Sequence, residues 1–419
     1  MSKLLLKQVT LKGKKVDILI DGKKISKIDS LINEAADKVI LGKNKTVIPG
    51  FINMHTHTAM TLMRGIKEDV PLQQWIERIW EIEPNLTSKM IYWGTKLAVL
   101  EMIKSGTTCF FDQYWQIDQA QKATFEMGIR AVHTYVILDL FDKEKAKVQI
   151  KNCKQMYEAS REWDSRTRFD VSFHADYSVS PEMIVWTSEF ARKNGLKVHI
   201  HLAETLKETN ADIEKHGMTP VKYLDSLGVL GPEVIAAHCV WLNDEDIEIL
   251  SRRKVNVVHN INSNLKLSSG YRFKYNELRN AGVNVCLGTD GVASSNNLDM
   301  LESMKTMALL QKAWREDPKA MPLNELLDVA TINGAKALSI DTGRVEVGAL
   351  ADLVLVDTHS SAFVPDFNFE ANLIYAANSS CVDMVICNGN IIMEGRKVAG
   401  EDEILEQTNK LAWELLKMS

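Results

Sequence analysis

The chain has 419 residues, of which 45% are hydrophobic and 25% are charged, and its formal net charge is -5. This length and composition are ordinary for a globular protein with a large core and more than one domain. The net negative charge and the absence of a long Lys/Arg cluster argue against a nucleic-acid partner, because such a partner requires a surface that neutralises phosphates.

The start of the chain and its cysteines carry no mark of secretion or membrane insertion. The first apolar run, Leu4 to Leu6, is too short for a signal-peptide core or a membrane span before lysines return. The six cysteines are scattered without a C-x-x-C pair, so neither a zinc knuckle nor a disulfide framework is indicated. We therefore expect a cytoplasmic protein with reduced, mostly buried thiols and no membrane partner.

The predicted elements begin with β structure and continue as a βα alternation. Residues 4–11, 16–21 and 24–28 predict short antiparallel strands separated by turn residues. From Val47 onward, apolar strands alternate with amphipathic helical stretches, which is typical of a parallel sheet. The eight strands are expected at 47–55, 107–114, 130–138, 168–176, 197–205, 234–241, 255–262 and 284–291. Eight such units predict a closed (β/α)8 TIM-type barrel.

Helical periodicity connects these strands, and β chemistry returns near the end of the chain. Apolar residues recur at three and four in stretches such as 89–104, 182–194 and 298–313, and one further helix is predicted at 324–338. Strands follow at 349–357 and 383–392, before an amphipathic tail. We expect the two β ends to pair into one small domain.

Polar residues follow the predicted barrel strands, where a barrel of this kind builds its active site. His55 and His57 project to the same side of an extended segment, so both imidazoles can reach one metal ion. His201 ends the fifth strand and Asp290 follows the eighth, adding a nitrogen and a carboxylate oxygen. Singly, His201 could be a hydrogen-bonded core residue, and Asp290 could shape the turn before Gly291. Together, the four residues predict a metal centre.

Several motifs in this order resemble the amidohydrolase superfamily: PGFINMHTH, HIHLAET, AAHCVWL, GTDG and GALADLVLVD. The resemblance covers essentially the whole chain and is strongest to adenosine-type deaminases and triazine hydrolases, in particular to 5-methylthioadenosine/S-adenosylhomocysteine deaminases. It implies one divalent metal, zinc or else iron, held by His55, His57, His201 and Asp290. Residue type alone does not exclude manganese.

The resemblance also implies how the domains are arranged. Both chain ends, 1–50 and 344–419 with its tail helix, are expected to form a β-sandwich, and 51–343 the metal-dependent barrel. The oligomeric state is left open, and a homo-oligomer is compatible with the tail helix.

Other polar residues at the same rim then acquire catalytic roles. Glu204 lies just beyond the fifth strand, where a carboxylate can protonate a ring nitrogen and pass a proton to the leaving amine. His238, on the sixth strand, can donate a hydrogen bond to the attacking water or to the developing oxyanion. Asp290 would also accept a proton from this water, whose pKa a metal lowers to about 7. The alternatives are a solvated loop glutamate for Glu204 and a core histidine for His238.

One competing subclass is tested by the fourth strand. Binuclear amidohydrolases such as hydantoinases resemble this fold but carry a carboxylated lysine at the end of that strand. This chain has His174 there instead, which points to one metal and, by resemblance, to a histidine that contacts the substrate. A buried, backbone-bonded His174 is the alternative.

A long loop after the first strand, 58–88, supplies candidate substrate contacts, since long barrel loops often close over ligands. Trp75 and Glu83 match the tryptophan and glutamate that meet the ribose in the nucleoside deaminases that this chain resembles. For Trp75, packing beneath the loop is the alternative. Ser294 would reach the purine edge by the same resemblance, although it could equally belong to a helix-capping turn.

The chain departs from its relatives at two places. Relatives that take S-adenosylhomocysteine bind its carboxylate through arginines after the third strand, where this chain has Tyr135. The nearby basic residues are Lys143, Lys145 and Lys147. Because lysine is a point charge rather than a bidentate fork, an uncharged 5-substituent is favoured. Ile261 replaces a proline that is usual in relatives, and this leaves the role of His259 open.

The sequence therefore predicts a metal-dependent hydrolytic deaminase of an adenine nucleoside such as 5-methylthioadenosine, 5-deoxyadenosine or S-adenosylhomocysteine. The alternative is a hydrolase that removes an amino or chloro group from another heterocycle, such as a triazine, a pterin or a guanine-like base. Glu204 favours deamination, since a poor leaving amine needs a proton donor and chloride does not. A metal-free scaffold protein would have lost ligands, yet all four are present.

Overall fold

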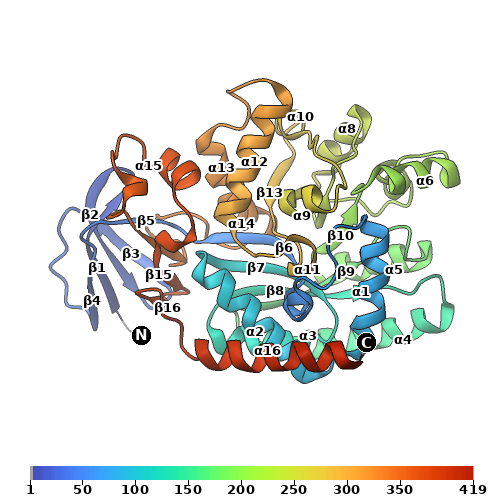
Figure 1. Cartoon of the computed structure of the whole chain (residues 1–419), viewed down its shortest axis with the longest axis horizontal. Coiled ribbons are helices and arrows are strands. Elements are labelled where there is room, and N and C mark those ends of the chain that lie inside the picture. The colour runs from blue at the N-terminus through green and yellow to red at the C-terminus, as the bar shows by residue number, and fades with distance from the viewer. Residues whose placement is uncertain (1–2, 419) are drawn as a thin grey trace.

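The computed structural model describes residues 3–418 and contains two eight-stranded sheets, of which the parallel one forms a barrel (Figure 1). The barrel strands follow one another in chain order. They are β6 (Phe51–Thr56), β7 (Thr107–Tyr114), β8 (Arg130–Ile137), β9 (Thr167–Phe173), β10 (Val198–Leu202), β11 (Val234–His238), β12 (Asn256–His259) and β13 (Asn284–Leu287). The backbone N–H groups of Thr289 and Asp290 donate to the carbonyl of His55, joining the end of β13 to β6. The predicted (β/α)8 barrel is confirmed.

Helices surround the barrel and follow its strands. They are α2 (Ser88–Lys104), α3 (Ile117–Met127), α4 (Lys143–Ala159), α5 (Pro181–Asn194), α6 (Leu206–His216), α7 (Pro220–Ser226), α8 (Asp244–Arg253), α9 (Ile261–Lys266), α10 (Tyr275–Asn280), α11 (Val292–Ser295), α12 (Met300–Arg315), α13 (Leu323–Ala330) and α14 (Ile332–Leu338). The helix predicted at 324–338 is thus two helices. They are divided at Thr331, whose φ of -136° and ψ of -90° are not helical.

The predicted first strand, 47–55, also consists of two elements. β5 (Lys45–Pro49) pairs with β14 (Leu353–Asp357) in the second sheet, and β6 enters the barrel after Gly50. A side chain at Gly50 would overlap that of Thr108, so this corner requires glycine. The apolar residues on both sides of Pro49-Gly50 led to one predicted strand, although this Pro-Gly pair is itself a turn signal.

The second sheet combines strands from both chain ends, as predicted. Its order is β16-β15-β14-β5-β1-β2-β3, and β4 pairs with β1. The bounds are β1 (Lys3–Leu11), β2 (Lys14–Asp21), β3 (Lys24–Asp29), β4 (Lys38–Leu41), β14 (Leu353–Asp357), β15 (Val382–Cys387) and β16 (Asn390–Glu394). Leu6 and Ile20 share one buried apolar cluster with Leu353 and Ile386, so both ends of the chain are needed for its core.

The segment 58–88, expected as a long loop, is mostly helical. It contains a 3-10 turn (Thr58–Met63), α1 (Leu72–Ile82) and a second 3-10 turn (Glu83–Asn85). Leu72, Trp75, Ile76 and Ile79 recur at three and four, which is the helical period that the loop interpretation overlooked. Short turns also lie at Ser160–Glu162, Ser361–Phe363, Phe369–Ala371, Asn372–Ala376 and Ser379–Cys381.

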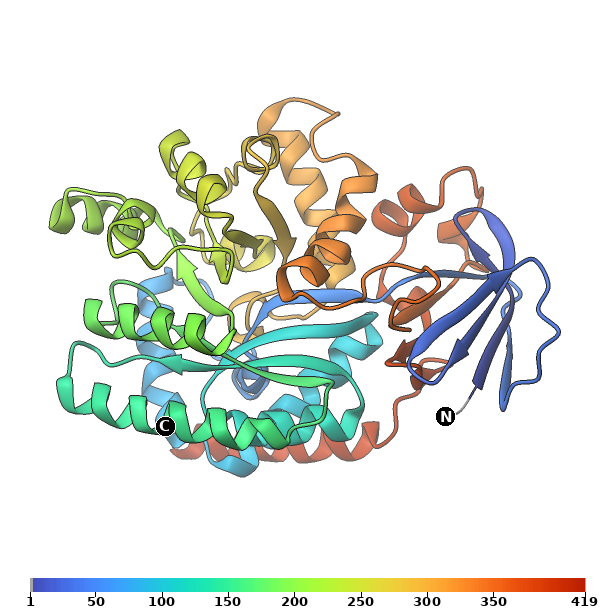
Figure 2. The same ribbon diagram turned by 180° about the vertical axis from the view of Figure 1, so that it is seen from behind.

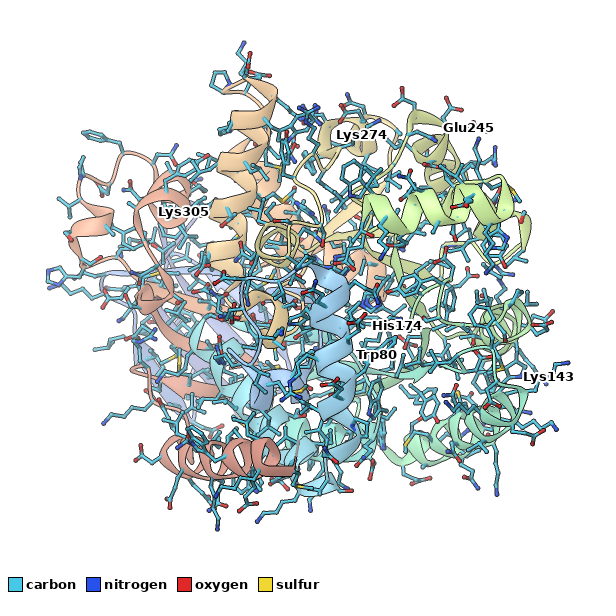
Figure 3. All side chains as sticks on the ribbon, turned by 45° about the vertical axis from the view of Figure 1, so that its right-hand side comes forward. Trp80, Lys143, His174, Glu245, Lys274 and Lys305 are labelled. Carbon is cyan, nitrogen blue, oxygen red and sulfur yellow. The ribbon has the colours of Figure 1, made fainter. Side chains whose placement is uncertain are left out.

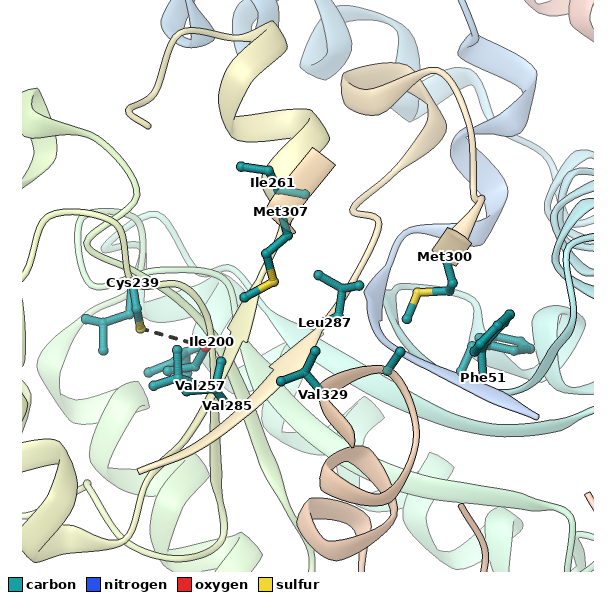
Figure 4. Close-up of a cluster of buried hydrophobic side chains, with 14 of the residues drawn as sticks. Phe51, Ile200, Cys239, Val257, Ile261, Val285, Leu287, Met300, Met307 and Val329 are labelled. Atoms are coloured by element: carbon teal, nitrogen blue, oxygen red, sulfur yellow. Dashed lines mark hydrogen bonds between the residues drawn. The ribbon is translucent and has the colours of Figure 1, made fainter. Parts of the chain in front are cut away.

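The main core lies between the barrel strands and their covering helices (Figure 4). Val257 of β12 and Val285 of β13 are buried in the same cluster as Met307 of α12 and Val329 of α13. Burial of apolar surface on this scale is the dominant stabilising term for a barrel. The core therefore holds the strand ends, and the polar residues on them, in fixed positions.

The last helix, α16 (Glu401–Met418), runs along α2 and ends near α1 (Figures 1 and 2). Its Leu411 belongs to the apolar cluster that also contains Trp75 and Ile79 of α1. The chain terminus therefore supports the helix that covers the barrel rim. Within residues 3–418, no helix is long and apolar enough to cross a membrane. All six cysteines are free and buried, as expected.

Candidate active site

The four predicted ligands converge at the carboxyl end of the barrel. The Nε2 atoms of His55 and His57 lie 3.4 Å and 3.3 Å from Oδ1 of Asp290. One ligand atom of each of His55, His201 and His238 also lies within 4.8 Å of the other two. All five side chains are buried or nearly so. Strands at opposite ends of the sequence thus meet at one point.

The imidazoles are held so that nitrogens remain available in the centre. Nδ1 of His57 lies 2.7 Å from the carbonyl of Gln113, and Nδ1 of His201 lies 2.8 Å from that of His174. A carbonyl only accepts, so both Nδ1 atoms donate and each Nε2 keeps a lone pair. Nε2 of His55 is buried without a hydrogen-bond partner. A buried acceptor without a partner is costly, and a cation would satisfy it.

The carboxylate of Asp290 completes this donor set. Ser263 donates to its Oδ2 at 2.5 Å, and the Gly291 N–H donates to Oδ1 at 2.7 Å. Burial opposes ionisation of Asp290, but the adjacent imidazoles of His55 and His57 hold its pKa well below the usual range. Three imidazole nitrogens and one carboxylate oxygen are the donors that zinc or iron takes in proteins, so the residues fit a divalent metal.

His238 is oriented as a hydrogen-bond donor. Its Nδ1 lies 2.9 Å from Nδ2 of Asn264, which can only donate, so the ring proton resides on Nε2. Burial lowers the pKa of His238 to about 4, which keeps the ring neutral at physiological pH. A neutral N–H beside the metal ligands can stabilise a developing oxyanion.

Glu204 lies in the same buried site. It is 7% exposed, and Ser269 donates to its Oε1 at 3.3 Å. Burial and the negative charge of Asp290 raise the pKa of Glu204 to about 8. The carboxyl therefore carries a proton at neutral pH, which suits a general acid.

These residues line one pocket together with aromatic and apolar side chains. The lining residues are His57, Met60, Leu72, Trp75, Ile76, Ile79, Trp80, Glu83, Gln113, Tyr114, Trp115, Val136, His174, Tyr177, His201, Glu204, His238, Leu267 and Asp290. The polar groups are thus gathered against an apolar wall contributed largely by α1. This is the usual composition of a site for a small organic ligand.

Two of the predicted substrate contacts, Trp75 and Glu83, lie at the pocket wall. Trp75 lines the pocket, and its Nε1 also donates to the carbonyl of Ala293 at 3.1 Å. Glu83 is buried at the pocket wall, and Tyr114 donates to its Oε1 at 2.7 Å. Burial raises the pKa of Glu83 to about 7. Its other oxygen, Oε2, can accept from a ligand.

His174 and Ser294 differ in their relation to this pocket. His174 lines it, and its ring lies 6.0 Å from that of Trp80 in an edge-on arrangement (Figure 3). The hydroxyl of Ser294 instead donates to the carbonyl of Gly291 at 2.8 Å, at the start of α11. Ser294 is not among the lining residues of the pocket in the described chain.

Sequence reasoning did not single out the residues that orient the site. His199 contacts Nδ1 of His55 through its own Nε2 at 2.6 Å, beneath the ligands. Its position two residues before His201, on the same strand face, was the available signal. Ser263 and Asn264 offered none, because their contacts depend on how the segment after β12 folds back. His259, whose role was open, stacks on Phe273 with ring centroids 3.9 Å apart.

Known proteins resemble this chain in sequence and in fold. Residues 46–392 match the model of the amidohydrolase family. The chain is 43% identical to a 5'-deoxyadenosine deaminase of Methanoregula boonei, over 96% of this chain and 92% of that protein. It is also 43% identical to a 5-methylthioadenosine/S-adenosylhomocysteine deaminase of Thermococcus sibiricus, over 92% and 91%. An adenosine deaminase from Xanthomonas campestris with bound zinc superposes with a TM-score of 0.94 at 28% identity, covering 99% and 98% of the two chains.

Proposed function

This chain belongs to the amidohydrolase family, and we propose that it deaminates adenosines whose 5-substituent carries no charge. It is a hydrolase that acts on a C–N bond and releases ammonia. One observation carries the substrate proposal. Glu204 and His238 line the same pocket as Glu83 and Trp75, which supports a substrate that needs a proton donor for its base and an acceptor for its hydroxyls.

The metal that we propose is one zinc ion. His55, His57, His201 and Asp290 would hold it, and iron would satisfy the same donors. When bound, such an ion acts as a Lewis acid and lowers the pKa of a water molecule to about 7. The unpartnered Nε2 of His55 and the zinc in the Xanthomonas adenosine deaminase support this assignment.

Three residues of the chain would then carry out the proton transfers and hydrogen bonding of the reaction. Asp290 accepts a proton as the water oxygen bonds to the amine-bearing ring carbon. Glu204 gives its proton to the adjacent ring nitrogen, and the Nε2–H of His238 donates to the developing oxyanion. The ionised Glu204 then takes the remaining water proton from the new hydroxyl and passes it to the amino group, so that the C–N bond breaks and ammonia leaves. The proton held by Asp290 returns to Glu204 at the end of the turnover. The balance is one water consumed and one ammonia released for each oxo-purine formed.

The ribose end of the substrate would meet Glu83 and Trp75. Glu83 keeps Oε2 available because Tyr114 occupies only Oε1. An ionised carboxylate is a strong acceptor for two neighbouring hydroxyls. His174 would contact the base or sugar, and the contact predicted for Ser294 stays a prediction.

The pocket offers no cation to a substrate carboxylate. None of its lining residues within the described chain is lysine or arginine. Tyr135 bonds to Asn152 of α4, and Lys147 pairs with Glu144 at 2.7 Å on the exposed face of α4. Figure 3 shows Lys143 far from Trp80 and His174. A homocysteine carboxylate would therefore lose hydration without gaining an ion pair, which disfavours S-adenosylhomocysteine.

Ammonia release by the zinc-loaded protein tests this function. The substrates are 5-methylthioadenosine, 5-deoxyadenosine, adenosine, S-adenosylhomocysteine, guanine and a chlorotriazine, with the ultraviolet change of the ring followed in parallel. We expect the two uncharged 5-substituted adenosines to have the highest kcat/KM. Turnover of guanine or the chlorotriazine without any adenosine would contradict the proposal and favour the other heterocycles.

We propose that the enzyme works in the cytoplasm and that its partner is its small-molecule substrate. The described chain has no helix that could cross a membrane, which is compatible with this setting.

A further inference from the structure

Glu208 is a partly buried carboxyl on α6 that none of the proposed roles uses. Its Oε2 accepts the backbone N–H of Glu204 at 3.0 Å and that of Thr205 at 3.3 Å. In return, Oγ1 of Thr205 accepts the Glu208 N–H at 3.1 Å. The two residues form a capping box that starts α6, and the box extends one residue further back, to Glu204.

The backbone around Glu204 is fixed on its other side as well. Ala203 has a left-handed φ of 49°, which a residue with a side chain adopts only when its surroundings impose it. Its carbonyl accepts the N–H groups of Val240 and Trp241, each at 3.0 Å. Hydrogen bonds therefore hold the backbone on both sides of Glu204, at the carbonyl of Ala203 and at the N–H of Glu204 itself.

The side chain of Glu204 has little direct support by comparison. Its one bond to a hydroxyl is the 3.3 Å contact from Ser269, and Nδ1 of His238 lies 3.7 Å away. The direction of the Glu204 side chain is thus set mainly by its backbone. A change at the Glu204 N–H would move the carboxyl that the reaction needs.

We propose that Glu208 is a positioning residue that aims the Glu204 carboxyl at the reacting ring through the Glu204 N–H. This inference rests on the proposed role of Glu204 as the proton donor. The hydrogen bond from the Glu204 N–H to Oε2 of Glu208 is the observation that carries it.

The environment of Glu208 shows which replacement should preserve this role. Its Oε1 is buried without a hydrogen-bond partner, as are Oδ2 of Asp176 and Oδ2 of Asp212 nearby. Burial beside the Glu204 carboxyl raises the pKa of Glu208 to about 8, so its own carboxyl is neutral at pH 7. Glutamine is also neutral and keeps an oxygen that can accept from Glu204, so Glu208→Gln is the conservative variant.

Three variants separate positioning from helix capping. Glu208→Ala removes the acceptor, and Glu208→Gln keeps it. Asp246→Ala is the matched control, because Asp246 closes the same kind of capping box with Asn243 at the start of α8, away from the pocket. Thermal unfolding and metal content are measured for each, and kcat and KM are measured beside the wild type.

We expect Glu208→Ala to lose on the order of tenfold to hundredfold in kcat, with KM and zinc content close to wild type, since a misplacement of about 1 Å has such an effect. Glu208→Gln should restore kcat to within about threefold. Asp246→Ala should unfold at a lower temperature but keep its kcat, because it leaves the Glu204 N–H untouched. Wild-type kcat in Glu208→Ala, or an equal loss in Asp246→Ala, would overturn the proposal.

A crystal structure of zinc-loaded Glu208→Ala gives a readout that does not depend on the substrate. The Glu204 carboxyl should be displaced in this variant and remain in place in Glu208→Gln. An unmoved Glu204 would overturn the positioning role even where the wild type deaminates adenosines. A displaced Glu204 in a protein that deaminates no adenosine would instead contradict only the proposed function.

Discussion

Oδ1 of Asp290 lies 3.3 Å from Nε2 of His57, although the two residues follow the last and first strands of the barrel. The backbone bonds from Thr289 and Asp290 to the carbonyl of His55 bring these strands together. A metal bound here would therefore join the two ends of the barrel. Its binding free energy would add to the free energy of unfolding, because the unfolded chain has no such site.

Removal of the metal should lower the thermal unfolding temperature of the wild type. Free zinc at one hundred times its Kd contributes about 2.7 kcal/mol to the folded state. Asp290→Asn should reduce both this zinc-dependent shift and kcat, because the amide is a weaker ligand and does not take up a proton. Differential scanning fluorimetry with and without a chelator measures the shift. Glu204→Gln is the control, since it alters the same pocket but keeps all four ligands.

Glu204→Gln should keep the metal and the fold but lose most turnover. Glutamine cannot deliver a proton, and general acid catalysis of this kind contributes about a hundredfold to ten-thousandfold. The measurement is kcat at saturating substrate, with metal content and unfolding temperature determined on the same preparation. A variant with full zinc and wild-type kcat would remove Glu204 from the role of proton donor.

Much of the site was predictable because barrel geometry converts strand ends into neighbours. His55 and His57 are two apart on a strand, and His201 and Asp290 each follow an apolar run. Polar residues at the carboxyl ends of barrel strands share one rim. The sequence alone therefore predicts that these four residues lie close together. The close approach of these side chains agrees with that rule.

What the sequence did not reveal depends on short-range packing. Pro49-Gly50 is a turn signal between β5 and β6, but only the contact with the side chain of Thr108 shows why glycine is needed there. Tyr135 bonds to Asn152 of α4, while its neighbour Val136 lines the pocket. Successive side chains of a strand point to opposite faces. A shift of one residue in the predicted strand therefore exchanges the side chain that lines the pocket for one that contacts the covering helix.

Substrate affinity should weaken as the pH falls through about 7, because burial raises the pKa of Glu83 to about 7. Only the ionised carboxylate accepts two ribose hydroxyls, so protonation below that pH removes an acceptor and KM rises. The expected rise is about tenfold per pH unit, in line with titration of one group. Glu83→Gln should have a high KM that no longer changes with pH in this range.

The control for this pH dependence is Glu81→Gln, on the exposed face of α1, which ends just before Glu83. Glu81 pairs with Arg78 at 3.0 Å and is 66% exposed. Its loss should leave the KM profile of the wild type unchanged. A Glu83→Gln profile identical to that of the wild type would show that another group causes the titration.

A buried ion pair joins the barrel to the second sheet, and breaking it should destabilise the protein without affecting the site. Nε of Arg130 lies 3.1 Å from Oδ2 of Asp352, and the two residues are 5% and 1% exposed. Asp352→Ala leaves the Arg130 guanidinium buried without its carboxylate, which costs about 3–5 kcal/mol. Exchanging both partners, as in Arg130→Met with Asp352→Ala, should recover part of this loss, because no charge then stays buried.

Urea unfolding of the zinc-loaded variants measures these differences. The control is Lys147→Ala, which removes an exposed pair and should change the free energy of unfolding by less than about 1 kcal/mol. Equal losses in the single and double variants would mean that apolar packing, rather than an unpaired charge, holds the two sheets together.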